Sequence, residues 1–150
     1  MKIHDIKEKI KKNQEDTKQT YDRVRNLNSE LRNLQVTLKK MEIDSLSEYI
    51  EIGSTYTFQK LCMFSGVQTG IKKDTKVHNP IFRPQDVIEF VKKNQKSFVI
   101  KCIKLGDQQP NTIFRIDNDS VYYQLMNDKD FKSRFETFVN RKETLKDLGI

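Results

Sequence analysis

The chain has 150 residues, of which 33% are charged and 35% hydrophobic, and its formal net charge at pH 7 is +7. This length corresponds to one ordinary domain, and no apolar run approaches the roughly 20 residues of a membrane span. The charged N-terminus lacks the apolar segment of a secretory signal peptide, so we expect a cytoplasmic protein.

Positive charge is concentrated in the middle of the chain. Residues 60–104 carry 10 basic and 3 acidic side chains, whereas residues 105–150 carry 7 and 8. A basic segment raises the local concentration of nucleic acids or acidic proteins. The alternative is that the positive charge reflects a generally Lys-rich composition and has no binding role.

Residues 3–41 follow an unbroken heptad pattern and contain neither Gly nor Pro. The a and d positions are Ile3, Ile6, Ile10, Asn13, Thr17, Thr20, Val24, Leu27, Leu31, Leu34, Leu38 and Met41. This pattern predicts a helix about 60 Å long at about 1.5 Å per residue, ending near Asp44 and Ser45. Because two positions in seven make too narrow a stripe for one helix to bury alone, we assign 1–43 to a coiled-coil oligomerisation helix.

The two halves of this seam differ. Its C-terminal half is apolar throughout, and we expect oligomerisation through Val24, Leu27, Leu31, Leu34, Leu38 and Met41. Between Asn13 and Thr20 the seam is polar, which predicts a loose region or a place where another chain packs. A self-paired dimer is the first interpretation. A heteromeric coil, or packing on the C-terminal helix, is the alternative, and strand direction and oligomer number stay open.

Residues 44–150 predict a small α+β binding module. Residues 49–58 are rich in β-branched and aromatic types and favour a strand, and 65–80 is typical of a loop. A turn at 83–86 precedes a β-hairpin formed by 87–91 and 97–104, with a basic tip at 92–96. The alternative for its first arm is a short helix opened by Pro84.

A second hairpin is expected from 112–116 and 121–126, followed by a helix capped by Asn127 or Asp128. One face of that helix would carry Phe131, Phe135, Phe138, Leu145 and Leu148. The order of these strands resembles that of SH3-like and other small β-barrels. The predicted fold class is therefore α+β: a long coiled-coil helix, then a small antiparallel β-barrel-like module with a C-terminal amphipathic helix.

The sequence offers little for catalysis. The histidines are His4 and His78, and the cysteines are Cys62 and Cys102, both in apolar neighbourhoods typical of reduced core thiols. A Cys/His nucleophile pair using His78 is the alternative. No cluster has zinc or calcium spacing. We therefore expect no enzyme activity, cofactor, metal or small-molecule substrate.

Basic side chains with aromatic residues between them define a second candidate surface. The residues are Lys72, Lys73, Lys76, Arg83, Lys92, Lys93, Lys96 and Lys101. Bases could stack on neighbouring rings such as Phe82, Phe90 and Phe98 while lysines neutralise phosphates. The competing interpretation places these rings in the core.

These observations predict a non-enzymatic, homo-oligomeric adaptor whose coiled coil presents small β modules to a protein partner, without contact with membranes. The alternative is a nucleic-acid-binding accessory protein that uses the basic surface of 65–104. Small size and a composition rich in Lys, Asn and Ile resemble those of phage or mobile-element accessory or structural proteins. That resemblance would place the protein in the host cytoplasm or in a virion.

Overall fold

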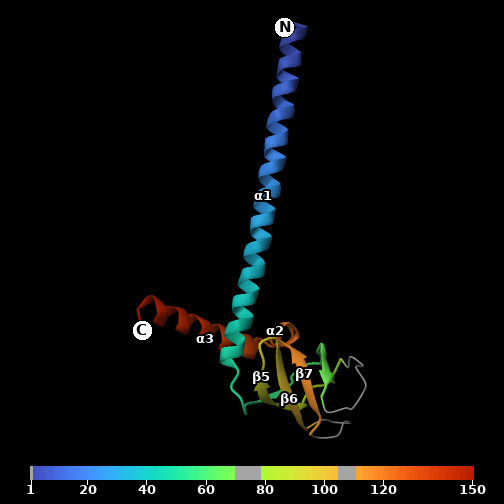
Figure 1. The fold of residues 1–150 in the computed structure, drawn as a ribbon, viewed down its shortest axis with the longest axis vertical. Helices are drawn as coiled ribbons and strands as arrows, with labels where there is room; N and C mark the ends of the chain where they lie inside the picture. The colour runs from blue at the N-terminus through green and yellow to red at the C-terminus, as the bar shows by residue number, and fades with distance from the viewer. Residues whose placement is uncertain (1, 70–78, 105–110) are drawn as a thin grey trace. The chain divides into compact units, whose positions relative to one another are not determined.

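The computed structural model describes residues 2–69, 79–104 and 111–150. The chain divides into two compact units, Met1–Met41 and Glu42–Ile150. The first consists of most of helix α1 (Ile3–Tyr49), and the second contains the last turns of α1, all the strands and two further helices (Figure 1). The predicted α+β class is confirmed.

Helix α1 continues further than predicted. It is unbroken for 47 residues and ends at Tyr49, so the predicted end near Asp44 and Ser45 is wrong. The apolar positions change phase there, but Ile43, Leu46 and Ile50 keep the helical steps of three and four. The change of phase marks a new surface to be buried: Leu46 is 0% exposed. The chain leaves the helix before Gly53, whose φ is 88° and whose N–H donates to the Phe90 carbonyl at 2.7 Å.

The main sheet is open and antiparallel. Its strands are β1 (Thr55–Thr57), β5 (Val87–Lys93), β6 (Ser97–Lys104), β7 (Ile113–Asp117) and β3 (Gly66–Gln68), in that order across the sheet. β2 (Cys62–Met63) and β4 (Ile81–Phe82) form a separate pair. Because β1 and β3 stand at opposite edges of the sheet, no closed barrel forms among the described strands, and the SH3-like prediction is not confirmed.

The first predicted hairpin is confirmed, and its helical alternative is wrong. β5 and β6 pair in antiparallel register, with Ile88 opposite Cys102 and Phe90 opposite Ile100. Irregular pairing follows Val87 and Phe90, where one strand carries an additional residue. The turn before β5 forms as predicted, and Gln85 occupies it with a φ of 78°.

The second predicted hairpin is wrong in its second arm. β7 forms, but the residues expected as its partner strand make helix α2 (Asn118–Leu125). The physical reason is the spacing of the buried residues, because Val121 and Leu125 lie four apart and both enter the core. The aromatic and β-branched types Val121, Tyr122 and Tyr123 favoured a strand, and tertiary packing overrode that preference.

The other predicted strand and loop are corrected in extent. Of the strand predicted at 49–58, only Thr55–Thr57 is extended and paired. Strand β3 lies within the loop predicted at 65–80, of which 70–78 lies outside the described residues. Gly66 permits β3 to approach β7, because a Cβ at this position would lie 2.3 Å from the Arg115 carbonyl oxygen.

The core of unit 2 is aromatic. Phe58 and Phe82 stack with ring centroids 4.7 Å apart and planes 4° from parallel, and both are fully buried. Phe64 meets both rings edge-on. Strands β5, β6 and β7 add Phe90, Phe98 and Phe114 and aliphatic side chains from the inner face of the sheet. The end of α1 adds Leu46 and Ile50, and the C-terminal part of the chain adds Phe131 and Phe135. The core therefore contains residues from both ends of unit 2.

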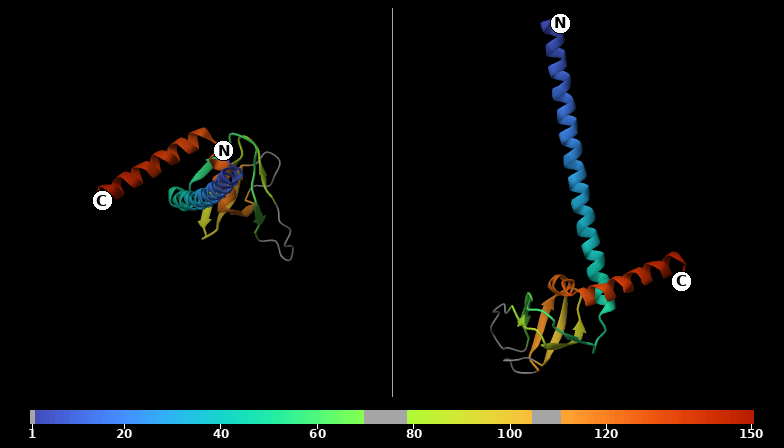
Figure 2. Two further views of the ribbon diagram at one scale, coloured as in Figure 1. Left: turned by 90° about the horizontal axis from the view of Figure 1, so that it is seen from above. Right: turned by 180° about the vertical axis from the view of Figure 1, so that it is seen from behind.

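Helix α3 (Lys129–Asp147) begins as predicted, with Asp128 as its N-cap. Phe131 and Phe135 are buried, and the Tyr49 ring contacts both of them and Phe138 at centroid distances of 5.2–5.7 Å. Leu145 and Leu148 are 42% and 68% exposed, so the predicted apolar face is buried only along its N-terminal half. Both views in Figure 2 show α3 extending beyond the sheet.

We expect Asp128→Ala to destabilise unit 2 by about 1–2 kcal/mol through loss of a helix cap. The Asp128 carboxylate accepts hydrogen bonds from the N–H groups of Asp130 and Phe131 and, at 2.6 Å, from the Tyr56 hydroxyl. Urea unfolding followed by circular dichroism measures the change. Asp130→Ala, which removes a first-turn carboxylate without removing the cap, is the control.

The pH dependence of this effect has a defined sign. Burial opposes ionisation of Asp128, but hydrogen bonds from Tyr56, Phe131 and Asp130 lower its pKa below the usual 3.8. The ionised group therefore stabilises the folded state fully above that value and progressively less as pH falls through the folded pKa. The free energies of unfolding of wild type and Asp128→Ala should therefore converge as pH falls. A gap between them that widened on acidification would contradict the role of ionised Asp128 as the cap.

Candidate interaction surfaces

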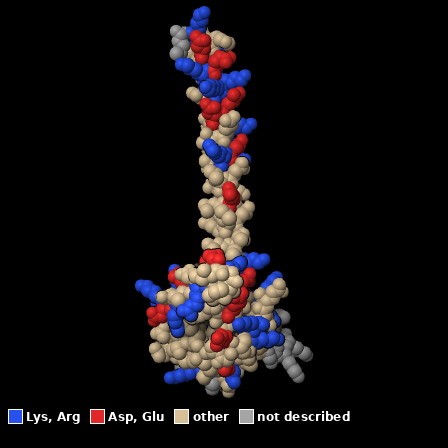
Figure 3. Space-filling view, turned by 90° about the vertical axis from the view of Figure 1, so that its left-hand side faces the viewer, with Lys and Arg blue, Asp and Glu red and all other residues tan. Residues whose placement is uncertain are grey.

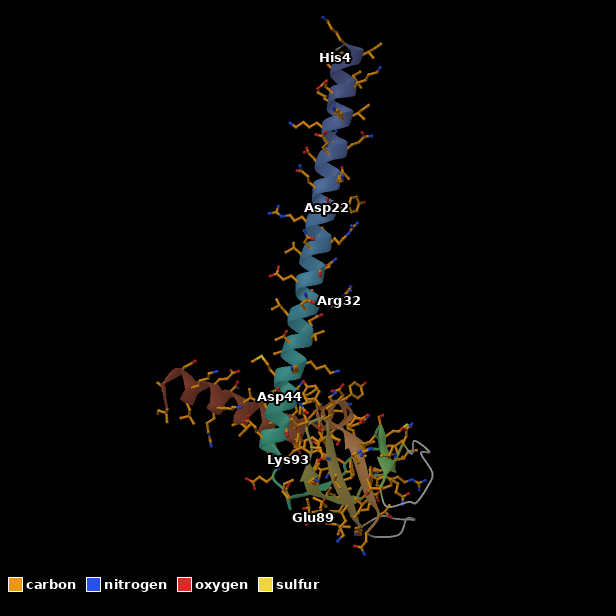
Figure 4. The ribbon with its side chains drawn as sticks, in the orientation of Figure 1. His4, Asp22, Arg32, Asp44, Glu89 and Lys93 are labelled. Atoms are coloured by element: carbon orange, nitrogen blue, oxygen red, sulfur yellow. The ribbon has the colours of Figure 1, made fainter. Side chains whose placement is uncertain are left out.

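The seam of unit 1 is an exposed apolar stripe on a continuous helix. In the single chain, Val24 is 48% exposed and Leu34 and Met41 are each 60% exposed. Leu27, Leu31 and Leu38 lie between these values. Figure 4 shows side chains projecting from all sides of α1, including His4, Asp22 and Arg32. Six large apolar residues at heptad spacing therefore lie open on one side of α1, and between residues 24 and 41 Val36 is the one large apolar residue outside the seam.

The seam ends where unit 2 begins. Leu46 and Tyr49, by which the end of α1 packs into unit 2, occupy heptad positions b and e when the register of the seam is continued. The residues that the unit 2 core uses are thus different in phase from the a and d residues. Neither surface competes with the other for the same side chains.

The predicted basic residues do not gather on one surface. Lys92 pairs with Val99 and Lys101 pairs with Glu89, and the alternation along β6 places them on the outer face of the sheet. Lys93 pairs with Phe98, whose side chain is in the core, so it lies toward the opposite face. The described part of the predicted basic surface is therefore divided between two faces.

The remaining predicted residues lie elsewhere. Lys96 is exposed in the connection between β5 and β6. Arg83 lies in the turn before β5, where its backbone N–H donates to an Asp86 carboxylate oxygen at 2.8 Å. Lys72, Lys73 and Lys76 lie outside the described residues.

The sequence interpretation missed Arg115. This exposed residue pairs with Val99 on one side and Val67 on the other, which puts it on the outer sheet face with Lys92 and Lys101. Its position between the buried Phe114 and Ile116 could have revealed this, because residues alternate between the two faces of a strand.

Charges of both signs share the surface of unit 2. Glu89 and Asp117 point to the same outer face as the three cations just described. In the view of Figure 3, Lys and Arg side chains of this unit are interspersed with Asp and Glu side chains. The outer face is therefore amphipathic and of mixed charge, with Val67, Val99 and Ile113 between the charged groups.

Three of the aromatic residues considered for base stacking are core residues. Phe82, Phe90 and Phe98 are 0%, 3% and 1% exposed. The Tyr56 and Tyr122 hydroxyls donate to the carboxylates of Asp128 and Glu42. Burial, followed by the bond to Glu42, raises the pKa of Tyr122 to about 12, so this phenol is a neutral anchor. The interpretation as core residues is confirmed for Phe82, Phe90 and Phe98, whereas Tyr123 is 67% exposed.

Small, shallow clefts are present on the described part of unit 2. The first, of about 290 Å³, is bordered by Tyr49, Tyr56 and Phe131, with Glu51 and Arg134 also lining it. The second, of about 270 Å³, lies by Lys60, Cys62 and Asn127. Both are slightly smaller than typical small-molecule sites, which begin at roughly 300 Å³, and would each accommodate about one large side chain.

The thiols have the environment of core residues. Cys62 is 7% and Cys102 0% exposed, as expected for the predicted core thiols. Burial raises the pKa of Cys62, and it raises that of Cys102 to about 11, opposite to the shift that activates a nucleophile. His78 lies outside the described residues. In the ranges that the structure describes, no group of three or more His, Cys, Asp or Glu residues is arranged to hold a metal ion.

Neither a search for membrane spans nor comparison with known proteins indicates a function for this chain. Within the described residues, no helix combines the length and apolar character needed to cross a membrane. Searches against protein-family models, curated proteins and solved structures found no match to this chain.

We expect both thiols to resist modification in the folded protein. A colourless aromatic disulfide reagent at pH 8 should label neither cysteine on the timescale of minutes and both after addition of guanidinium, because buried, protonated thiols do not attack. Absorbance of the released thiolate measures the reaction. Rapid labelling of either Cys62 or Cys102 under native conditions would contradict the core assignment.

Proposed function

We propose that the chain is a non-enzymatic interaction protein that associates with a second copy of itself through the seam and presents two copies of unit 2 to a protein partner. The observation that carries this proposal is the exposed, unbroken a/d stripe from Val24 to Met41. An isolated helix gains nothing from such a stripe. A second helix of the same pattern buries it by packing knobs into holes.

The energetics favour association through this stripe. Fully burying a leucine side chain contributes about 1.5–3 kcal/mol, and six half-exposed apolar residues are available on each chain. Their burial must offset the lost translational and rotational freedom, which costs about 4–15 kcal/mol. The two quantities are comparable, so the stripe is large enough to offset the cost of association, and the surplus sets the affinity of the dimer.

The outer sheet face of unit 2 is the surface that we assign to the partner. It combines Val67, Val99 and Ile113 with Lys92, Lys101 and Arg115. A mixture of aliphatic and charged groups suits a protein surface, because the charges orient the partner and the apolar area supplies affinity. Two copies held on one coil would bind a repetitive partner with higher avidity than one copy.

Leu34→Glu and Val36→Glu test self-association with a matched pair. In the single chain these residues are 60% and 65% exposed, but Leu34 is a d residue and Val36 is an f residue. We expect Leu34→Glu to weaken the dimer at least about 100-fold, because it puts a carboxylate into a core layer of both chains. Val36→Glu should leave it unchanged. Light scattering after size-exclusion chromatography measures the mass across a concentration series.

Equal effects of the two substitutions would contradict the proposal, because they would show that position on the helix does not matter. A wild-type chain that is still monomeric at about 100 μM would also contradict the proposed self-association.

Nucleic-acid binding is less well supported. The phenylalanine rings considered for stacking on bases are buried, and on the outer face three cations stand among two carboxylates. We expect no saturable binding of a fluorescently labelled DNA or RNA of about 30 nucleotides at roughly 50 mM salt. Fluorescence anisotropy measures the binding. Binding that fell steeply with salt and was lost in Lys92→Ala/Lys101→Ala/Arg115→Ala would favour the nucleic-acid alternative.

A further inference from the structure

The polar half of the seam contains one layer that differs from its neighbours. The Thr17 hydroxyl donates to the Asn13 carbonyl at 2.7 Å, and the Thr20 hydroxyl donates to the Asp16 carbonyl at 2.9 Å. Both hydroxyls are therefore satisfied within their own helix. A second helix packed on these positions would meet threonine side chains whose polar atoms already have partners.

The Asn13 side chain, unlike the two threonine hydroxyls, has no hydrogen-bond partner within its own helix. Its side chain makes no hydrogen bond to another group in the described part of the chain, and it is exposed at a d position. Its amide has two N–H donors and an acceptor oxygen. In a coiled-coil core these groups would lose water and would need a partner from the opposing helix, because a buried amide without one costs free energy.

We propose that two copies of unit 1 pair in parallel and in register, with Asn13 opposite Asn13 of the second copy as the layer that fixes the alignment. This inference rests on the self-association proposed above and adds its direction and register. In a parallel coil each core layer contains two residues of the same heptad position, so Asn13 meets an identical amide that can both donate and accept. The leucines also meet leucines.

An antiparallel coil would have no comparable solution. There an a residue faces a d residue, and an alignment that covers the whole seam puts Asn13 opposite Leu31. The amide would then be buried without a partner. Shifting the helices until Asn13 faces Thr17 leaves Leu34 and Met41 beyond the overlap and exposed. Both antiparallel alignments thus lose the Asn13 pair, and the second also leaves the most apolar part of the seam exposed.

The charges beside the seam are compatible with the parallel alignment. In that arrangement a g residue lies near the e residue five positions later in the other chain. The pairs are Lys9 with Gln14, Asp16 with Tyr21, Arg23 with Asn28, Glu30 with Gln35 and Thr37 with Glu42. Each of these five pairs contains at most one charge, and the remaining pair, Lys2 with Lys7, involves a residue that precedes the helix. These five flanking pairs also contain no ion pair that would fix the register. The register must then be set by a core layer, which we identify as Asn13.

Ile10→Cys tests direction and register in the full-length chain. Residue 10 is an a position one layer from Asn13, so a parallel, in-register pair brings the two thiols together, whereas the antiparallel alignment separates them by tens of ångströms. Under a glutathione redox buffer, we expect most of the variant to run as a disulfide-linked dimer on a non-reducing denaturing gel. Wild type, with Cys62 and Cys102 buried, should run as single chains.

Asn13→Leu and Thr17→Val, each in the Ile10→Cys background, test the role of the amide. Asn13→Leu should raise the melting temperature but lower the crosslinked fraction at least about twofold, because other alignments then lose no amide pair. Thr17→Val replaces a hydroxyl already bonded within the helix, so the crosslinked fraction should not change. Light scattering reports the mass of each variant.

The outcomes separate the two proposals. A dimeric mass without the Ile10→Cys crosslink overturns the parallel alignment and leaves self-association intact. Full crosslinking in Asn13→Leu, equal to that in Thr17→Val, overturns the role of Asn13 in the register. A monomeric wild-type chain overturns self-association and with it this inference.

Discussion

Unit 2 depends on the packing of the last turns of α1 into its aromatic core. Leu46 and Ile50 are almost completely buried, and the Tyr49 ring holds the start of α3 through Phe131 and Phe135. The same helix carries the exposed a/d stripe up to Met41. A continuous helix thus meets two burial demands, and the change of phase between Met41 and Leu46 keeps them on different side chains. This arrangement leaves the stripe exposed while unit 2 folds on other residues.

The use of aromatic residues in the core limits the chemistry left on the surface. Phe58, Phe82 and Phe98 are buried, and the Tyr56 and Tyr122 hydroxyls are bound to carboxylates. What remains outside on the sheet is aliphatic and charged. The deeply placed thiols have raised pKa values, which suits structural cysteines.

Much of the local structure could be predicted because it depends on neighbouring residues. The turn at Gln85, the β5–β6 hairpin and the Asp128 cap each follow from a pattern a few residues long. The strand predicted at 121–126 failed because Val121 and Leu125 lie in the core at helical spacing, and that burial requires β6 and β7 to be in place. The placement of the predicted basic residues has a similar cause, because strand register decides that Lys92 joins Arg115 on the outer face while Lys93 does not.

The sequence alone determined the seam, since a heptad pattern is a property of one helix and needs no knowledge of what else the chain does. It also determined that the cysteines lie among apolar neighbours. Only the tertiary structure decided that α1 continues to Tyr49, that the sheet stays open with β1 and β3 at its edges, and which side chains share the outer face. The physical reason is the range of the interactions involved. Helix periodicity and capping act over a few residues, whereas sheet order and burial join residues such as Gly66 and Ile116 that lie far apart in the chain.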